Sequence, residues 1–142
     1  MQAAILRVKL NHLDAYCASR AEAAQRYDTM LSDVPLVKTP FRDPRSSHVF
    51  HQYTLQVAPE IRDALVQHLS DEGIPTGVYY PIPGHRQKAF AHCRYNPTDF
   101  PISEALSKSV ISLPMHTELT ESEQYRVSST LVKFVMQVNL PV

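Results

Sequence analysis

The residues best suited to chemistry lie in one loop near the middle of the chain, GIPTGVYYPIPGH over residues 73–85. Its prolines restrict the backbone and push the residue before each of them toward extended geometry. Such a loop has little conformational entropy left to lose when it binds a ligand. Tyr79, Tyr80 and His85 offer hydrogen bonds and stacking surface that suit a sugar or a nucleotide. The same residues also fit a proline-rich turn after an edge strand, with both tyrosines half-buried.

Three further histidines are weaker candidates for a site. His48 and His51 fall on opposite faces of a predicted strand, so they cannot bind one metal ion together. His51 lies on the apolar face, which favours a hydrogen-bonded core histidine over a ligand. His116 stands in a loop from which it could reach a site.

Several common catalytic and binding motifs are missing from the sequence. Three glycines are too few for a glycine-rich phosphate loop, and no G-x-S-x-G nucleophile motif occurs. Cys17 and Cys93 lack the pattern of a disulfide framework or a zinc site, so we expect no metal and a reducing, cytoplasmic location. The charged loop with Arg42, Asp43 and Arg45 is expected to be a solvated surface.

The composition is that of a globular domain, with 44% hydrophobic and 20% charged residues in a chain of 142. Lys and Arg number 14, as do Asp and Glu, which argues against nucleic acid or an anionic membrane as a partner. No apolar stretch approaches the roughly 20 residues of a membrane-spanning helix. The first residues also lack the features of a signal peptide.

Apolar periodicity predicts an α+β fold, a small antiparallel or mixed sheet covered by helices. A long helix is predicted over residues 1–31, either bridging two domains or bending near Ser19 and Arg20. It starts without a capping residue, so we expect the chain to begin within something larger. The elements predicted after it are a strand over 48–57, a helix from Pro59 that Gly73 stops, a short strand over 76–80, a helical turn over 85–92, a helix from Pro101, a short strand over 111–113 and a helix begun by a capping box at 120–123.

Four segments resemble signatures of the DegT/DnrJ/EryC1/StrS family of sugar aminotransferases, in the family's order. They are residues 1–10, HVFHQY at 48–53, EGIPTGVYYPIP at 72–83 and SLPMH at 112–116. The resemblance implies the small, carboxy-terminal domain of a fold-type-I aminotransferase. Residues 1–31 would then be an interdomain helix and residues 32–142 the small domain itself.

The resemblance also implies where the chemistry resides. Family members hold pyridoxal phosphate through a lysine in a large domain that precedes this part, and transamination needs that amine. The five lysines of this chain lie outside any such motif; they are Lys9, Lys38, Lys88, Lys108 and Lys133. We therefore expect no catalytic residue here, and no retention of pyridoxal phosphate by the chain alone.

For substrate binding, the resemblance points to Tyr79, Tyr80 and His85, whose counterparts approach the sugar or its diphosphate. Many relatives carry His-Tyr at the tyrosine pair, which makes Tyr80 the stronger candidate. Gly84-His85-Arg86 departs from the Leu-His-Leu of many relatives, and Arg86 adds a cation that could contact phosphate. The loop is most similar to enzymes of lipopolysaccharide biosynthesis that aminate a UDP-linked 3-keto-N-acetylhexosamine or its uronic acid, with glutamate as donor.

Three interpretations follow from the resemblance. The chain is a fragment that is inactive alone, a non-catalytic sugar-nucleotide-binding or assembly module, or one half of a split enzyme. The apolar stripe of the first helix predicts self-association or a large-domain partner chain.

Overall fold

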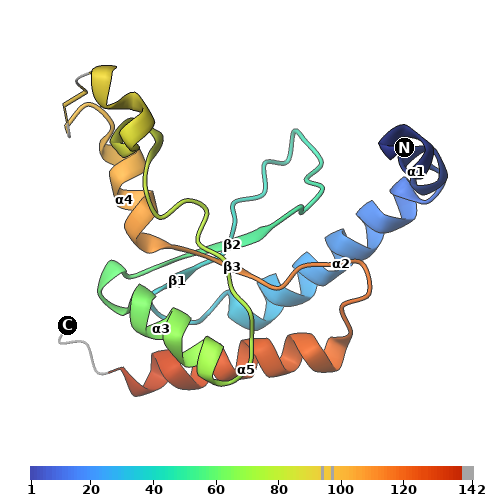
Figure 1. Ribbon diagram of the computed structural model, residues 1–142. Coiled ribbons are helices and arrows are strands. Elements are labelled where there is room, and N and C mark those ends of the chain that lie inside the picture. Colours follow the sequence, from blue (N-terminus) through green and yellow to red (C-terminus); the bar gives the residue numbers. More distant parts are fainter. Residues whose placement is uncertain (94, 97, 139–142) are drawn as a thin grey trace.

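The computed structural model describes residues 1–93, 95, 96 and 98–138, and it has the predicted α+β fold (Figure 1). A three-stranded antiparallel sheet has the order β1 (Val37–Lys38), β2 (Tyr53–Val57) and β3 (Val110–Leu113). The register places Val37 opposite Val57 and Tyr53 opposite Leu113. No helix in the described part of the chain is long and apolar enough to cross a membrane.

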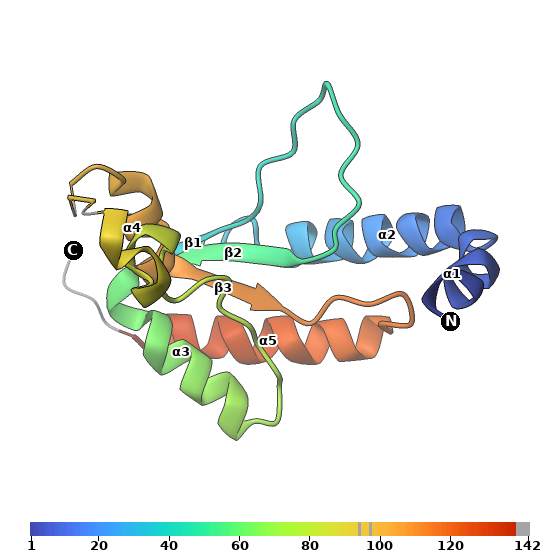
Figure 2. The same cartoon turned by 45° about the horizontal axis from the view of Figure 1, so that its top comes forward.

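The core lies between the sheet and the helices α2 (Leu13–Leu31), α3 (Pro59–Asp71) and α5 (Glu121–Gln137). Both views place α3 and α5 on one side of the sheet, while the loop over residues 39–52 projects on the other (Figures 1 and 2). Alternation in β2 buries one face, and a helical stripe does the same in α3. The core residues that these two elements contribute are Tyr53, Leu55, Val57, Ile61, Leu65 and Leu69.

Two predicted helix boundaries are confirmed. Gly73 follows α3 with φ of +70°, the left-handed conformation that favours glycine at a helix end. Thr120 caps α5 in a capping box, in which its side chain accepts from the Glu123 backbone and the Glu123 side chain accepts from the Thr120 backbone.

The first helix is interrupted, at a different place from the predicted bend. It consists of α1 (Gln2–Leu10) and α2, separated at Asn11 and His12, where the His12 amide donates to the Lys9 carbonyl in a tighter turn. Asparagine competes with the helix for backbone hydrogen bonds, which accounts for a break there. At Ser19 the helix continues, and the Ser19 hydroxyl donates to the carbonyl of Ala15 one turn earlier.

The predicted strand over residues 48–57 is wrong in its first half. Only Tyr53–Val57 forms β2, because Phe50 adopts φ of +46° and turns its side chain into the core. His51 is consequently exposed, which corrects the expectation of a core histidine. The short strand predicted over 76–80 is reduced to a single bridge between Gly77 and Ser112, and β1 was not predicted.

The remaining elements agree with the sequence to within a few residues. Two 3₁₀ helices, η1 (Gly84–Arg86) and η2 (Lys88–Cys93), occupy the predicted helical turn. Helix α4 (Pro101–Ser109) then leads directly into β3. Figure 1 shows this group at the end of the sheet opposite α1.

Candidate functional site

The loop with the two tyrosines is attached to the sheet at Gly77. The Gly77 amide donates to the Ser112 carbonyl at 3.0 Å, and the Ser112 amide donates back to the Gly77 carbonyl at 2.7 Å. The chain then leaves the sheet through the Tyr79–Tyr80 peptide bond, which is cis. Tyr79 is 49% exposed and Tyr80 72% exposed, so neither phenol is part of the core.

Gly77 also makes room for the ring of Tyr79. A Cβ atom at Gly77 would lie 2.5 Å from Cε2 of Tyr79, closer than any normal contact. The ring therefore folds back over the glycine, and any larger residue at this position would displace it. The orientation of Tyr79 depends on a residue two positions earlier.

The first groove beside these tyrosines lies between the loop and helix α4, and we call it the α4 groove. Its volume is about 410 Å³. It is lined by Tyr79, Tyr80, Ile82, Pro83, Gly84 and Gln87 from the loop and by Ser103, Leu106, Ser107 and Val110 from α4 and β3. Aromatic, hydroxyl and amide groups face one space, a set suited to a polar ring such as a sugar.

A second groove, which we call the histidine groove, lies on the other side of Tyr79 and has a volume of about 340 Å³. It is lined by residues 51 and 52, by residues 75–77 and Tyr79, and by residues 112–116. Three segments that the sequence singled out for their resemblance therefore meet in one place. Tyr79 lines both grooves, so its ring stands between them.

Two histidines contribute to the histidine groove and one does not. His51 and His116 both line it, and Nδ1 of His116 lies 3.7 Å from a carboxylate oxygen of Glu118. His48 instead stacks on Phe50, with ring centroids 4.2 Å apart, and its Nδ1 accepts from the Phe50 amide at 2.9 Å. Sequence reasoning placed His48 and His51 on opposite faces and could not foresee that His51 meets His116.

His85 and Arg86 lie beside the α4 groove but do not line it. Both reach Oε1 of Glu104 on α4, from His85 Nε2 at 2.7 Å and from Arg86 Nε at 2.6 Å. The hydrogen bond from Arg86, followed by that from His85, holds the pKa of Glu104 below its usual value. The structure therefore brings Tyr79 and Tyr80 together and turns the other two predicted ligands toward α4, so substrate binding by His85 and Arg86 stays a prediction.

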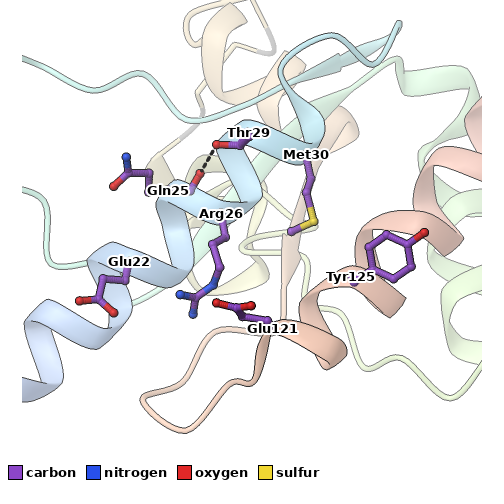
Figure 3. A pocket seen from close by; sticks show the side chains of 7 residues that line it. All are labelled: Glu22, Gln25, Arg26, Thr29, Met30, Glu121 and Tyr125. Carbon is purple, nitrogen blue, oxygen red and sulfur yellow. Dashed lines mark hydrogen bonds between the residues drawn. The ribbon is translucent and has the colours of Figure 1, made fainter.

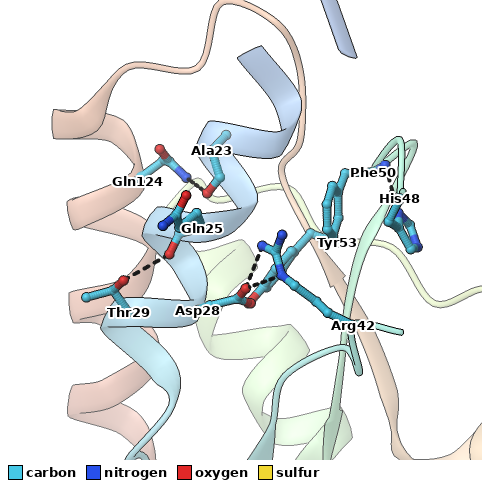
Figure 4. Close-up of polar contacts among 9 residues, drawn as sticks. All are labelled: Ala23, Gln25, Asp28, Thr29, Arg42, His48, Phe50, Tyr53 and Gln124. Carbon is cyan, nitrogen blue, oxygen red and sulfur yellow. Dashed lines mark hydrogen bonds and ion pairs between the residues drawn. The ribbon is translucent and has the colours of Figure 1, made fainter. Parts of the chain in front are cut away.

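The base of the projecting loop is held by a polar cluster that the sequence did not predict (Figure 4). Asp28 accepts from the Tyr53 hydroxyl at 2.6 Å and from Nε of Arg42 at 2.6 Å, and the Arg42 guanidinium lies 4.5 Å from the centroid of the Phe50 ring. Burial, and then the bond to Asp28, raise the pKa of Tyr53 above its ordinary value.

The expectation of a solvated charged loop holds only in part for Arg42, whose side chain is 41% exposed but also pairs with Asp28. It holds for Arg45, whose side chain is 87% exposed and pairs with Asp43 at 2.7 Å. The sequence held one signal for this cluster, the aromatic residue Phe50 in a polar segment. A buried aromatic ring needs neighbours that cover it, and here Arg42 and His48 do so.

The lysines of the chain lie outside both grooves. All five are exposed. Over residues 1–93, 95, 96 and 98–138, no group of three or more His, Cys, Asp or Glu side chains could hold a metal. Cys17 and Cys93 are free thiols.

A further groove lies between α2 and α5 (Figure 3), with a volume of about 570 Å³. It is lined by Glu22, Gln25, Arg26, Thr29, Met30, Glu121 and Tyr125. Arg26 reaches Gln124, a fully buried residue that donates to the Ala23 carbonyl at 2.8 Å and ties the two helices together (Figure 4). None of the predicted site residues lies here, and its charges are mixed, so we place the candidate site at Tyr79 and Tyr80.

Known proteins are similar to this chain in sequence and fold over most of its length. The EryC1 protein of Saccharopolyspora erythraea, named an erythromycin biosynthesis sensory transduction protein, is 40% identical over 92% of the chain. A UDP-N-acetyl-3-dehydro-alpha-D-glucosamine 3-aminotransferase of Acidithiobacillus ferrooxidans is 43% identical over 92%. The crystal structure of DesV from S. venezuelae, in complex with a ketimine intermediate, superposes with a TM-score of 0.92 and 32% identity over 97% of the chain.

The match covers only a part of each of these proteins. The chain spans 35% and 34% of the two relatives and 37% of the DesV chain, about a third of their length. The family's own sequence model matches residues 1–132. The chain therefore belongs to the DegT/DnrJ/EryC1/StrS aminotransferase family.

Proposed function

We propose that this chain forms the sugar-nucleotide side of the active site of a nucleotide-sugar aminotransferase. The observation that carries the proposal is the meeting of three separate segments around Tyr79, with Tyr80 exposed beside it. Phenol rings can stack on a sugar or a base, and their hydroxyls can hydrogen bond to either. Tyr80 is the residue that we expect to contribute most to binding.

The substrate that we propose is a UDP-linked 3-keto-N-acetylhexosamine or its uronic acid, with glutamate as the amino donor. The name of the Acidithiobacillus relative, at 43% identity, describes a 3-aminotransferase for such a sugar. We also propose a place in lipopolysaccharide or polysaccharide biosynthesis. The cytoplasm, inferred from cysteine usage, stays a prediction.

Pyridoxal phosphate would supply the electron sink for transamination, and we propose that it is held outside this chain. Since no lysine of the chain lies in either groove, we expect the chain alone to retain no cofactor and to catalyse no turnover. Adding pyridoxal phosphate should then produce no lysine-linked absorbance band; a stable band lost on substitution of a single lysine would contradict this part.

We also propose that a large domain, or a second copy of the chain, covers the first helix. Helix α1 buries none of its residues, and its large apolar side chains are exposed together with the start of α2; these are Ile5, Leu6, Val8, Leu10 and Leu13. Such a stripe is typical of an interface. Sedimentation at rising concentration tests the second copy, and a monomer at high concentration would leave the large domain as the partner.

The test of the binding site is calorimetry with UDP-N-acetylglucosamine. We expect binding that Tyr80→Ala weakens about tenfold, since stacking on an aromatic ring contributes about 1–3 kcal/mol. Tyr125→Ala is the matched control, because Tyr125 is 69% exposed, close to the 72% of Tyr80, but lies on α5. No heat at millimolar ligand, or equal weakening by both substitutions, would contradict the proposal.

A further inference from the structure

The α4 groove has two walls, one formed by the loop with the two tyrosines and one by helix α4 and the start of β3. Only the helix wall is bonded directly to the core. The helix wall is held from behind by Arg62 of α3, whose guanidinium donates to the carbonyls of Ser107 at 3.0 Å and Val110 at 3.3 Å. Arg62 has a side chain that is only 11% exposed, so this attachment is shielded from solvent. The opposite wall is formed by residues 77–86, which we call the tyrosine loop. The width of the groove therefore depends on how this loop is held.

The tyrosine loop is held at two points. At its start, the backbone pair of Gly77 and Ser112 joins it to β3. At its end, His85 and Arg86 both reach the same carboxylate oxygen of Glu104, at 2.7 Å and 2.6 Å. Between these points, no hydrogen bond among the described residues joins residues 78–82 to another segment.

The second attachment, at Glu104, is largely shielded from solvent. The His85 side chain is 7% exposed and that of Glu104 is 18% exposed, and the His85 ring packs 4.7 Å from the ring centroid of Phe100. Hydrogen bonds to an ionised carboxylate are roughly twice as strong as those between neutral groups. The α4 groove is not lined by His85, Arg86 or Glu104. These three residues therefore hold the tyrosine loop in place without forming the surface that a ligand would contact.

We propose that Glu104 is a positioning residue: through His85 and Arg86 it holds the loop of Tyr79 and Tyr80 against α4 and so sets the width of the α4 groove. The two prolines between the attachments stiffen the span, so fixing its ends fixes both tyrosines. The entropy of ordering the loop is then lost on folding and not on binding. The expected effect on ligand binding rests on the proposed function, whereas the expected effect on the rigidity of the loop does not.

The test compares Glu104→Ala with the wild-type chain by ¹⁵N relaxation. We expect order parameters of residues 79, 80, 82 and 84–86 to be near the rigid value of about 0.85 in the wild type and to fall below about 0.6 in the variant. Those of α3 and α5 should not change, which also shows that the variant is folded. Glu22→Ala is the matched control, because Glu22 is an exposed glutamate on α2.

Unchanged order parameters in Glu104→Ala would overturn the proposal. If that variant fails to fold, Glu104→Gln decides, because it keeps the shape but removes the charge; we expect it to loosen the same residues to a smaller extent, and a rigid loop there would equally overturn the proposal. With UDP-N-acetylglucosamine as the probe, Glu104→Ala should raise Kd about tenfold and Glu22→Ala should not. A wild-type chain that binds no probe would contradict the proposed function, while the order parameters alone would still decide the role of Glu104.

Discussion

The core and the periphery of the molecule differ in what their apolar side chains do. In α3, α5, β2 and the second half of α2, most of the apolar residues belong to one continuous core. Outside this core, helix α1 buries no residue, and the tyrosine loop exposes Tyr79, Tyr80 and Ile82. Together with the proposed function, this difference predicts that stability and recognition reside in different residues, so each can be changed while the other is measured.

The largest expected effect comes from the same substitution made in the core and in the exposed helix α1. Leu131→Ala removes a fully buried side chain of α5 and should lower the free energy of unfolding by about 2–5 kcal/mol. Leu6→Ala, at a residue of α1 that is 64% exposed, should change it by less than about 0.5 kcal/mol. Urea unfolding measures both. Equal effects would mean that α1 belongs to the core, which would remove the contrast.

A smaller effect is expected where the projecting loop joins the core. Asp28→Ala leaves the hydroxyl of the buried Tyr53 without its acceptor, at a cost of about 1–3 kcal/mol. Asp43→Ala breaks only the exposed pair with Arg45 and should have no measurable effect on unfolding. In a Tyr53→Phe background, Asp28→Ala should cost clearly less. An undiminished cost there would assign the effect of Asp28 to another contact.

The pair of Gly77 and Tyr79 offers the sharpest separation of recognition from stability. Gly77→Ala should push the Tyr79 ring aside and weaken binding of UDP-N-acetylglucosamine about tenfold, and Tyr79→Ala should weaken it to the same extent. Adding Gly77→Ala to Tyr79→Ala should cause no further loss, because the displaced ring is already gone. Additive losses in this double-mutant cycle would show that Gly77 acts independently of Tyr79.

The pH dependence of stability should be determined by two tyrosines of the core. Burial raises the pKa of both Tyr27 and Tyr53 above the ordinary value of 10.0. Because the unfolded chain loses these protons first, the stability they contribute is complete below pH 10 and falls as pH rises above it. Urea unfolding between pH 9 and 11 measures the fall, which Tyr53→Phe should reduce; an identical slope in that variant would contradict the assignment.

The sequence predicted the elements whose causes are local. The alternation through Tyr53, Leu55 and Val57, the glycine stop at Gly73 and the capping box at Thr120 each depend on a few neighbouring residues. The same alternation misled at Phe50, because burial of that ring between the projecting loop and the core overrides the local pattern.

The site was predictable in part, for the same reason. Tyr79 and Tyr80 stand out by residue type in a stiff loop, and the structure places both at one groove. His51 and His116 are 65 positions apart and meet only through the pairing of β2 with β3. The partner of His85 and Arg86 lies on another element, at Glu104, and no local pattern names it.

An NMR titration with UDP-N-acetylglucosamine tests most directly whether recognition resides in the exposed tyrosine loop. We expect backbone shifts to gather at residues 76, 77, 79, 80 and 112–116, each of which lines one of the two grooves, while the groove between α2 and α5 around Tyr125 stays unchanged. Shifts centred on Tyr125 and Arg26, or none at millimolar probe, would contradict the placement of the sugar-nucleotide site at Tyr79 and Tyr80.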